Sequence, residues 1–196
     1  MNTLTSQPLR ILVVDDDAAI RRTYQQIFEP AATPSAGLSA LVGASPPEYI
    51  EAERFELILA DQGETAASLH SAALAEGRPC HVAFIDMRMP PGWDGLRTAL
   101  ALRAQDPSIY IVISTAFADY DVAELQQALG HDVVLLRKPF SREEAYQLAL
   151  TLGQSWHTRQ RLERTTADIE HQVFARSAEL EKRISQQQAL AEIATR

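Results

Sequence analysis

Reactive side chains stand at the ends of several apolar runs in this sequence. The residues at these ends are Asp15, Asp16, Asp17, Asp86, Thr115 and Lys138. A carboxylate that ends a buried strand loses solvation free energy unless a hydrogen bond, a counter-ion or a metal compensates for it. For Asp86 alone, a simpler interpretation is that the carboxylate caps the helix after the strand. The pattern across the whole chain must decide between these two interpretations.

The chemistry of this set depends on whether the side chains converge. Several carboxylates at one place repel one another, and they stay ionised only if a cation neutralises them. Oxygen ligands without histidine or cysteine nearby favour magnesium over zinc. Lys138 and Thr115 would add a positive charge and a hydrogen-bond donor at the same place. Such an arrangement is suited to holding a tetrahedral dianion beside a divalent metal.

The elements that must position these residues follow a regular alternation. Short apolar runs predict strands at 10–14, 55–60, 81–85, 109–114 and 133–136. Helical patterns between and after them predict helices at 18–29, 64–76, 94–105, 119–129 and 141–155. This order predicts an α/β fold with a parallel sheet covered on both faces. Ligands of such sheets gather at the carboxyl ends of the strands, which is where the reactive residues stand.

Four motifs occupy the ends of four of these strands. They are VVDDD at 13–17, FIDMRMP at 84–90 with DG at 94–95, STA at 114–116 and KPF at 138–140. Together, and in this order, they resemble the receiver domains of two-component response regulators. The resemblance covers residues 9–155. It implies a doubly wound, flavodoxin-like sheet of five parallel strands in the order 2-1-3-4-5, followed by a long α-helix.

The resemblance implies a role for most of the acidic residues. Asp86 would accept a phosphoryl group from a phosphohistidine on a sensor histidine kinase or a phosphotransfer protein. Asp16 and Asp86 would bind Mg²⁺ together with the backbone carbonyl of Arg88, and Asp15 would contribute through a water molecule. Asp17 has no role in this scheme, and we expect it to cap the first helix.

The resemblance also implies that Lys138 pairs with the phosphoryl oxygens and that Thr115 donates a hydrogen bond to one of them. The only reaction implied is phosphorylation and dephosphorylation of the chain's own aspartate, so we do not expect an enzyme with a separate substrate. The chain departs from the family pattern at two places. The turn at 90–95 is one residue longer, and Leu135 stands where members that switch by swinging a ring inward carry an aromatic residue.

Two other functions remain open from the residues alone. The Asp-x-Asp spacing of Asp15 and Asp17 is compatible with a phosphatase that uses one of them as its nucleophile. The chain is also compatible with a fragment of a hybrid histidine kinase, or of a larger regulator whose enzymatic output domain lies beyond residue 196. No residue in the sequence indicates which kind of output domain the chain would control.

Three segments surround or interrupt the expected receiver domain. Residues 1–8 are expected to be a flexible N-terminus. Residues 30–54, rich in Ala, Pro and Ser, are too long for a plain helix-to-strand connection and form an insertion. A surface excursion without function and a binding segment are both open for it.

Residues 156–196 are expected to form a long helical extension. No glycine or proline occurs in this segment, and Leu162, Val173 and Ile184 are spaced by 11, as are Ile169, Leu180 and Ala191. Such a stripe favours pairing with a second copy of the chain as a coiled-coil homodimer, whereas a solvated helix that folds back is the alternative. The end at Ala-Thr-Arg lacks a capping signal, which is typical of a chain that continues into another domain.

Charge and composition restrict the partners and the compartment. The net charge of -8 and the pI of about 5.1 argue against direct binding to nucleic acid or to an anionic membrane. The single cysteine, Cys80, cannot form an internal disulfide, and the N-terminus lacks the order of a signal peptide. We therefore expect a cytoplasmic protein without a membrane-spanning segment.

Overall fold

The computed structural model describes residues 8–29, 55–116, 122–130 and 132–194 of the chain. The expected insertion at 30–54 and almost all of the expected flexible N-terminus lie outside the described residues.

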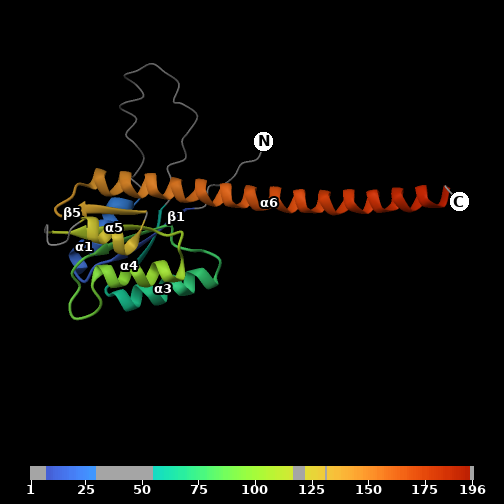
Figure 1. The fold of residues 1–196 in the computed structure, drawn as a ribbon. Helices are drawn as coiled ribbons and strands as arrows, with labels where there is room; N and C mark the ends of the chain where they lie inside the picture. The colour runs from blue at the N-terminus through green and yellow to red at the C-terminus, as the bar shows by residue number, and fades with distance from the viewer. Residues whose placement is uncertain (1–7, 30–54, 117–121, 131, 195–196) are drawn as a thin grey trace, which may run out of the picture. The chain divides into compact units, whose positions relative to one another are not determined.

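The described chain contains one five-stranded parallel sheet (Figure 1). Its strands are β1 (Leu9–Val14), β2 (Phe55–Ala60), β3 (Val82–Asp86), β4 (Tyr110–Thr115) and β5 (Val133–Arg137). The strand order is β2-β1-β3-β4-β5, and every neighbouring pair is parallel. The predicted strand positions and the predicted order 2-1-3-4-5 are therefore confirmed, with boundaries that shift by one residue.

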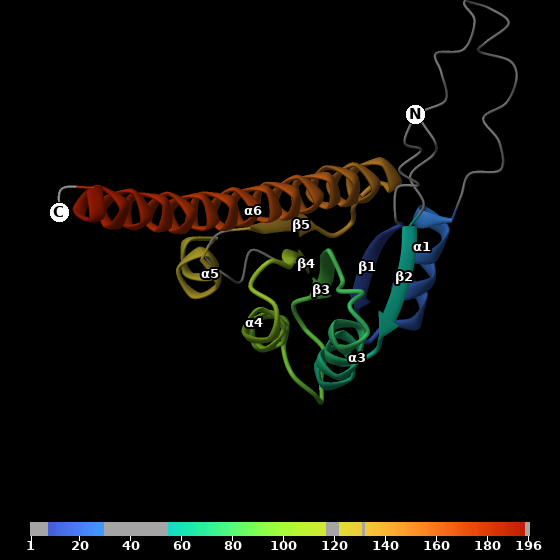
Figure 2. The same cartoon turned by 90° about the vertical axis from the view of Figure 1, so that its right-hand side faces the viewer.

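Helices cover both faces of this sheet (Figure 2). They are α1 (Ala18–Phe28), α3 (Gly63–Ala75), α4 (Gly95–Gln105), α5 (Val122–Leu129) and α6 (Arg142–Ala194). The core on the side of α3, α4 and α5 includes Leu12, Ile85, Ile111, Leu102 and Leu125. The core on the side of α1 and α6 includes Ile11, Val13, Tyr24, Phe84 and Trp156. The doubly wound architecture is thus present, with a separate apolar core on each face.

The alternation of side chains along β1 explains why both faces must be covered. Leu12 and Val14 belong to one core, and Ile11 and Val13 belong to the other. All four side chains are almost completely buried, and burial of an apolar side chain of this size contributes roughly 2 kcal/mol. An apolar run without polar alternation is therefore stable only as an inner strand between two layers of helices.

The start of α1 follows from a single capping residue. Asp17 has an extended backbone and its side chain accepts a hydrogen bond of 2.7 Å from the backbone N–H of Ala19. A carboxylate at this position satisfies a backbone donor that the helix itself leaves unpaired. The prediction that Asp17 caps the first helix is confirmed.

The last helix differs from the expectation of a separate helix at 141–155. In the structure α6 is one helix from Arg142 to Ala194. The chain offers no proline or glycine after Gly153 that would end it. Gly153 lies within this helix and lets it pack closely against Leu9. A Cβ atom at this position would lie 2.6 Å from the Leu9 side chain.

The chain divides into two compact units, Met1–Trp156 and His157–Arg196. The last residue of the first unit, Trp156, is buried: its ring lies 4.1 Å from the ring of His81, and its Nε1–H donates a hydrogen bond of 3.1 Å to Ser108 Oγ. These contacts tie α6 to the segments before β3 and β4.

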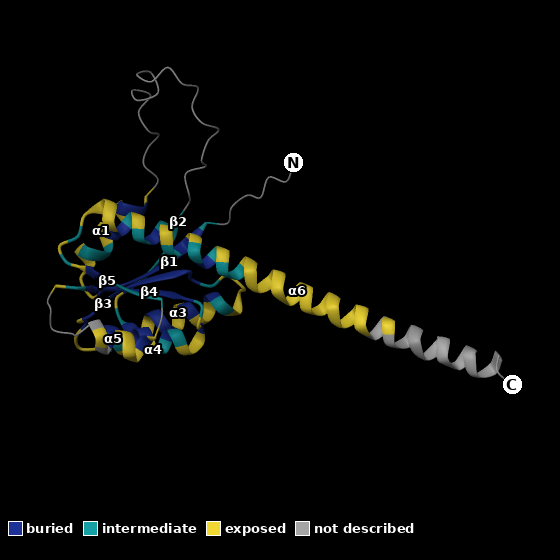
Figure 3. Ribbon diagram, turned by 45° about the horizontal axis from the view of Figure 1, so that its top comes forward, coloured by how far each residue is buried: buried dark blue, intermediate teal, exposed yellow. Residues whose placement is uncertain are grey.

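The second unit is helical through Ala194. Its large apolar side chains within the described part are exposed (Figure 3); they are Leu162, Ile169, Val173, Phe174 and Leu180. The predicted stripe is therefore uncovered over these residues, and the side chains of Ile184 and Ala191 lie outside the described ones. Within the described chain, the search for a helix long and apolar enough to span a bilayer finds none.

Candidate functional site

An ion-paired cluster lies where β1, β3 and β5 end. Lys138 Nζ is 2.7 Å from Asp15 Oδ2 and 2.7 Å from Asp86 Oδ1. Asp15 directly follows β1, Asp86 is the last residue of β3, and Lys138 directly follows β5. The expectation that strand ends bring distant reactive residues together is met by these three side chains. A lysine between two carboxylates offsets the repulsion that would otherwise force one of them to protonate.

Asp15 is the most buried member of the cluster. Its side chain is 3% exposed, and its Oδ1 accepts a hydrogen bond of 2.9 Å from the backbone N–H of Asp17. Its backbone carbonyl accepts a hydrogen bond of 2.6 Å from Arg21 Nη1. Burial raises the pKa of the Asp15 carboxyl, and the hydrogen bond from Lys138 opposes this rise. Asp15 is thus held on both of its oxygens in a poorly solvated position.

Asp86 is held in a different way and is more accessible. Its Oδ1 pairs with Lys138, its Oδ2 accepts a hydrogen bond of 3.0 Å from the backbone N–H of Arg88, and its side chain is 12% exposed. It does not cap the helix that follows. α4 begins at Gly95 and its cap is Asp94, whose side chain accepts from the backbone N–H of Arg97. The simpler interpretation of Asp86 as a helix cap is therefore wrong.

The start of α4 packs tightly behind Asp86. A Cβ atom on Gly95 would lie 2.5 Å from the backbone carbonyl oxygen of Asp86 and 2.8 Å from Cα of Met87. Both are backbone atoms, so they cannot move aside as a flexible side chain could. The Asp-Gly pair at 94–95 therefore serves two purposes: the aspartate caps the helix, and the glycine lets its first turn approach the strand end.

Lys138 continues the backbone ladder of β5 before its side chain enters the cluster. Its backbone N–H donates a hydrogen bond of 2.8 Å to the carbonyl of Thr115, and the bond to Pro139 is cis. Burial disfavours the charged ammonium, but the hydrogen bonds to Asp15 and Asp86 outweigh this effect and raise the pKa of Lys138. The lysine therefore stays positively charged at neutral pH.

The remaining members of the predicted set lie around the cluster. Thr115 is half-buried at the end of β4, and Asp16 and Arg88 are exposed. Ser114, directly before Thr115, pairs with Asp86 in the register of β3 and β4. This register puts Thr115 at the same sheet edge as the ion pairs. The roles expected for Thr115, Asp16 and the Arg88 carbonyl stay predictions.

The donor set at this edge fits the chemistry of Mg²⁺. Within the described residues no group of three His, Cys, Asp or Glu side chains forms a ready metal site. Mg²⁺ commonly uses only one or two carboxylates and completes its shell with water and phosphate oxygens. Asp15 and Asp86 already converge on a cation, the Lys138 ammonium, and Asp16, the residue after Asp15, is exposed. Asp16, Asp86 and the backbone of Arg88 would hold the metal, with Asp15 behind a water molecule.

The loop between Asp86 and α4 carries a partly exposed tryptophan. The guanidinium carbon of Arg97 lies 4.5 Å from the centre of the Trp93 ring, which is the geometry of a cation–π contact. This loop also contains the cis bond between Pro90 and Pro91. The turn at 90–95, which was predicted to be one residue longer than in the family pattern, therefore contains a cis peptide bond and a tryptophan that contacts an arginine of α4.

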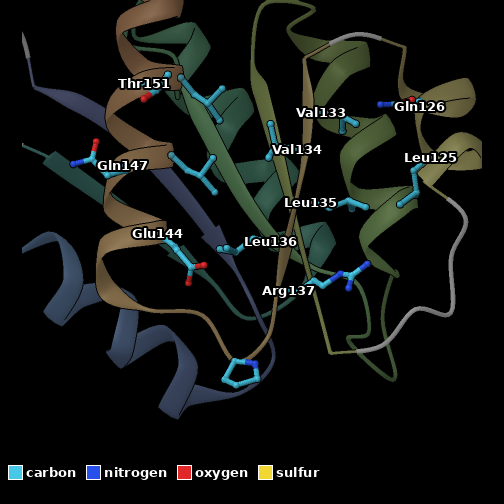
Figure 4. Close-up of a pocket in the computed structure, with 13 residues that line it drawn as sticks. Leu125, Gln126, Val133, Val134, Leu135, Leu136, Arg137, Glu144, Gln147 and Thr151 are labelled. Atoms are coloured by element: carbon cyan, nitrogen blue, oxygen red, sulfur yellow. The ribbon is translucent and has the colours of Figure 1, made fainter.

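A groove runs along β5, the edge strand, between α5 and α6 (Figure 4). Its volume is about 890 Å³, and Val133, Leu135 and Leu148 contribute to its apolar lining. Among the described residues that line it, Glu144 is the only carboxylate, and Lys138 does not line it. Leu135, the residue that replaces the expected aromatic side chain, therefore lines this groove, and the ion-paired cluster is a separate feature.

Two buried residues with hydroxyl groups near the cluster were not singled out from the sequence. Tyr24 on α1 and Ser114 on β4 are both buried, and the charges of Asp15 and Asp86 act on the Tyr24 hydroxyl. In the sequence Tyr24 belongs to the apolar stripe of α1, so it is indistinguishable from an ordinary core residue. The feature that could have distinguished Tyr24 is its hydroxyl group, because a buried tyrosine hydroxyl usually forms a hydrogen bond.

Comparisons with known proteins were made for the sequence and for the fold. No protein-family model matches the chain, and no curated protein matches its sequence. Solved structures do match its fold.

A CheY-like response regulator receiver domain protein from Methanospirillum hungatei is 17% identical, with a TM-score of 0.55, over 78% of this chain and 99% of that chain. The CheX–CheY complex with BeF3 and Mg²⁺ from Borrelia burgdorferi is 19% identical, with a TM-score of 0.54, over 78% of this chain and 94% of that chain. The signal receiver domain of an HD domain-containing protein from Pseudomonas fluorescens is 18% identical, with a TM-score of 0.57, over 82% of this chain and 97% of that chain.

Identities this low establish the fold only. The strand order, the helices on both faces and these structural matches agree with one another. The chain has the flavodoxin-like fold of CheY-like response regulator receiver domains, followed by a long C-terminal helix.

Proposed function

We propose that this chain is a phosphorylation-controlled signalling module whose Asp86 accepts a phosphoryl group from a phosphohistidine. The donor would be a sensor histidine kinase or a phosphotransfer protein. The observation that carries the proposal is the contact of Lys138 Nζ with both Asp15 and Asp86 at the carboxyl edge of a receiver-type sheet. A cation and two carboxylates at one edge provide the charge neutralisation that phosphoryl transfer requires.

Asp86 is the better nucleophile of the two buried carboxylates. An oxygen of Asp86 forms the new bond to phosphorus while the bond between phosphorus and the histidine nitrogen breaks, and the histidine keeps that electron pair. Asp15 is more deeply buried, with 3% of its side chain exposed against 12% for Asp86. Burial also raises the pKa of Asp15, so its charge is harder to maintain during the attack.

Lys138 is positioned to follow the charge as it develops. In the unphosphorylated chain its ammonium pairs with a carboxylate oxygen of Asp86. An acyl phosphate on Asp86 adds negative charge at that point, and the same ammonium can pair with a phosphoryl oxygen after a small movement. Mg²⁺, when bound, would neutralise further charge on the phosphoryl oxygens. Thr115 would donate its hydroxyl proton to one of these oxygens.

The alternative of a phosphatase with Asp15 or Asp17 as nucleophile has less support. The Asp15 side chain is only 3% exposed, and one oxygen of Asp17 accepts the capping hydrogen bond from Ala19. A side chain that caps a helix is oriented towards the backbone of that helix. The fold comparisons also lead to signalling domains.

The helical extension supports the second half of the proposal, that the chain signals as a homodimer. We propose residues 9–155 as the receiver module and residues 156–196 as the dimerising helix. Leu162, Ile169, Val173 and Leu180 are all more than half exposed. Their successive spacings of 7, 4 and 7 put them along one line of a helix. An exposed apolar line of this kind is stabilised when it pairs with the same line of a second copy.

Labelling by a small phosphodonor tests the proposed reaction. The chain is treated briefly with acetyl phosphate and Mg²⁺, and the modified residue is identified by mass spectrometry. We expect phosphate on Asp86, none after Asp86→Asn, and undiminished labelling after Asp17→Asn. Phosphate on Asp15 or Asp17 in the unmodified sequence would instead support the phosphatase.

A further inference from the structure

Tyr24 on α1 contacts the segments that carry two of the proposed site residues. Its ring centre lies 5.3 Å from that of Phe84, two residues before Asp86, and 5.3 Å from that of Phe140, two residues after Lys138. The Tyr24 residue is 1% exposed. Its ring therefore packs against the segments at the ends of β3 and β5, so a movement of either segment would change these ring contacts.

The hydroxyl of Tyr24 interacts with a third segment of the site. It lies near the hydroxyl of Ser114, which directly precedes Thr115 on β4. Ser114 must face the α1 side of the sheet, because its alternate neighbours on β4, Val112 and Tyr110, belong to the core that contains Tyr24. One side chain of α1 is thus in reach of segments that carry Asp86, Thr115 and Lys138.

Neither hydroxyl is satisfied in the described structure. Tyr24 Oη and Ser114 Oγ are both buried and lie close enough to interact, but neither forms a hydrogen bond of ordinary geometry with another described group. Buried hydroxyls nearly always have a partner, because leaving one unpaired costs free energy. A pair of unsatisfied hydroxyls beneath a reactive site is therefore an unfavourable feature that a second conformation could relieve.

The charges of the site influence the state of this hydroxyl. Burial raises the pKa of Tyr24, the interaction with the Ser114 hydroxyl lowers it, and the charges of Asp15 and Asp86 raise it. The phenol therefore keeps its proton at neutral pH and can donate it in a hydrogen bond. Ser114 Oγ is the neighbouring acceptor within the described residues.

We propose that Tyr24 is a positioning residue of the switch: its hydroxyl has only a contact short of a full hydrogen bond with Ser114 Oγ before phosphorylation, and it donates a full hydrogen bond to Ser114 Oγ once Asp86 carries a phosphoryl group. The proposal rests on the function proposed above. The hydroxyl of Thr115 approaches the phosphoryl oxygen, and the peptide bond carries Ser114 along with it. The new hydrogen bond stabilises the phosphorylated conformation.

Thermal unfolding with a phosphoryl mimic tests the proposal. The full chain is unfolded with and without beryllium fluoride and Mg²⁺, and the apparent Kd for beryllium fluoride is obtained from the rise in Tm. The unmodified chain should show a rise that Asp86→Asn abolishes. If the unmodified chain shows no rise, the proposed function fails, whatever the behaviour of Tyr24.

Tyr24→Phe then isolates the hydroxyl while keeping the ring. Without beryllium fluoride the variant should be at least as stable as the unmodified chain, because an unpaired buried hydroxyl has been removed. With the mimic its Tm rise should be smaller, and its apparent Kd should increase about three- to tenfold, the value of one neutral hydrogen bond. Ser114→Ala should have the same effect, and the double variant should lose no more than either single one.

Tyr146→Phe is the matched control. Tyr146 also packs against an aromatic ring, with its centre 5.3 Å from that of Phe55, but it lies on α6 away from the ends of β3 and β4. It should leave the Kd for beryllium fluoride unchanged. An equal Tm rise in the unmodified chain, Tyr24→Phe and Ser114→Ala would overturn the proposal, as would a bridging water that satisfies both hydroxyls in both states.

Discussion

Lys138 Nζ and Asp15 Oδ2 lie 2.7 Å apart, although 123 positions separate these residues in the sequence. The same ammonium is 2.7 Å from Asp86 Oδ1. Asp15 therefore holds the lysine beside Asp86, the proposed phosphorylation site, before any phosphate arrives. The cost of ordering a long, flexible side chain is met in the resting state, so it need not be met during the reaction.

Replacement of Lys138 by methionine should both destabilise the chain and prevent phosphorylation. The variant leaves the buried Asp15 carboxylate without its cation, and breaking a buried pair costs roughly 3 kcal/mol. Denaturant unfolding in EDTA measures this loss, and Mg²⁺ should recover part of it by replacing the missing charge. Lys138→Arg keeps the charge and should lose less stability. Unchanged unfolding of Lys138→Met in EDTA would contradict the structural role of the ion pair.

Replacement of Gly95 by alanine should impair Asp86 through the backbone. The added Cβ would lie 2.5 Å from the Asp86 carbonyl oxygen, so the strand end or the first turn of α4 must move. We expect a loss of about 1 to 3 kcal/mol in unfolding free energy and slower labelling by acetyl phosphate. Gly77→Ala is the control, because Gly77 has a φ of 68° but no atom within 4 Å of the added Cβ. It should lose stability through backbone strain while keeping the labelling rate.

The buried His70 should make stability fall in mild acid. The residue is completely buried, neither ring nitrogen forms a hydrogen bond with another described group, and Nε2 is 3.8 Å from Asp106 Oδ2. Burial lowers the pKa of His70 below its ordinary value of 6.5. The unfolded chain therefore takes up this proton at a higher pH than the folded chain.

The contribution of His70 to stability is present above pH 6.5 and is lost as the pH falls towards the folded pKa, with a slope of at most about 1.4 kcal/mol per pH unit. Denaturant unfolding at several pH values measures this slope. His70→Leu should flatten it, whereas His171→Leu, at an exposed position, should leave it as it was. A slope that is equal in all three chains would show that another group is responsible.

A charge on the apolar line of the helical extension should abolish the proposed dimer. Val173→Glu places a carboxylate on that line, and we expect sedimentation equilibrium to change from dimer to monomer. His171→Glu adds the same charge two residues away, on the opposite side of the helix, and should leave the dimer intact. A monomeric unmodified chain would favour the solvated helix instead.

The ends of the strands could be predicted from the sequence because an apolar run and the polar residue that ends it are local features of the chain. The apolar runs before Asp15 and Asp86 predict inner strands, and the parallel topology then brings their carboxyl ends to one edge. The strand order itself came from the resemblance carried by the motifs, and the structure confirms it. Asp17 was assigned as a cap from its position alone, and this also agrees.

Other features depend on contacts that the sequence does not encode locally. The resting partners of Lys138 are two carboxylates, whereas the motif indicates only a phosphoryl partner. The close approach of the buried Tyr24 and Ser114 hydroxyls results from three-dimensional packing. In the sequence, Tyr24 looks like any other member of the apolar stripe of α1. The helix at 141–155 and the helical extension after it were predicted as separate segments, whereas in the structure they form the single helix α6, in which Gly153 accommodates the side chain of Leu9.

The two tryptophans of the chain stand in contrasting surroundings. Trp93 lies in the loop after Asp86 beneath the Arg97 guanidinium, whereas Trp156 is buried against the imidazole of His81. Indole emission is sensitive to the polarity and the quenching groups around it, so the unlabelled chain carries its own optical reporters. With Trp156→Phe the remaining emission would follow the loop after Asp86 in real time, and with Trp93→Phe it would follow the surroundings of Trp156 on α6.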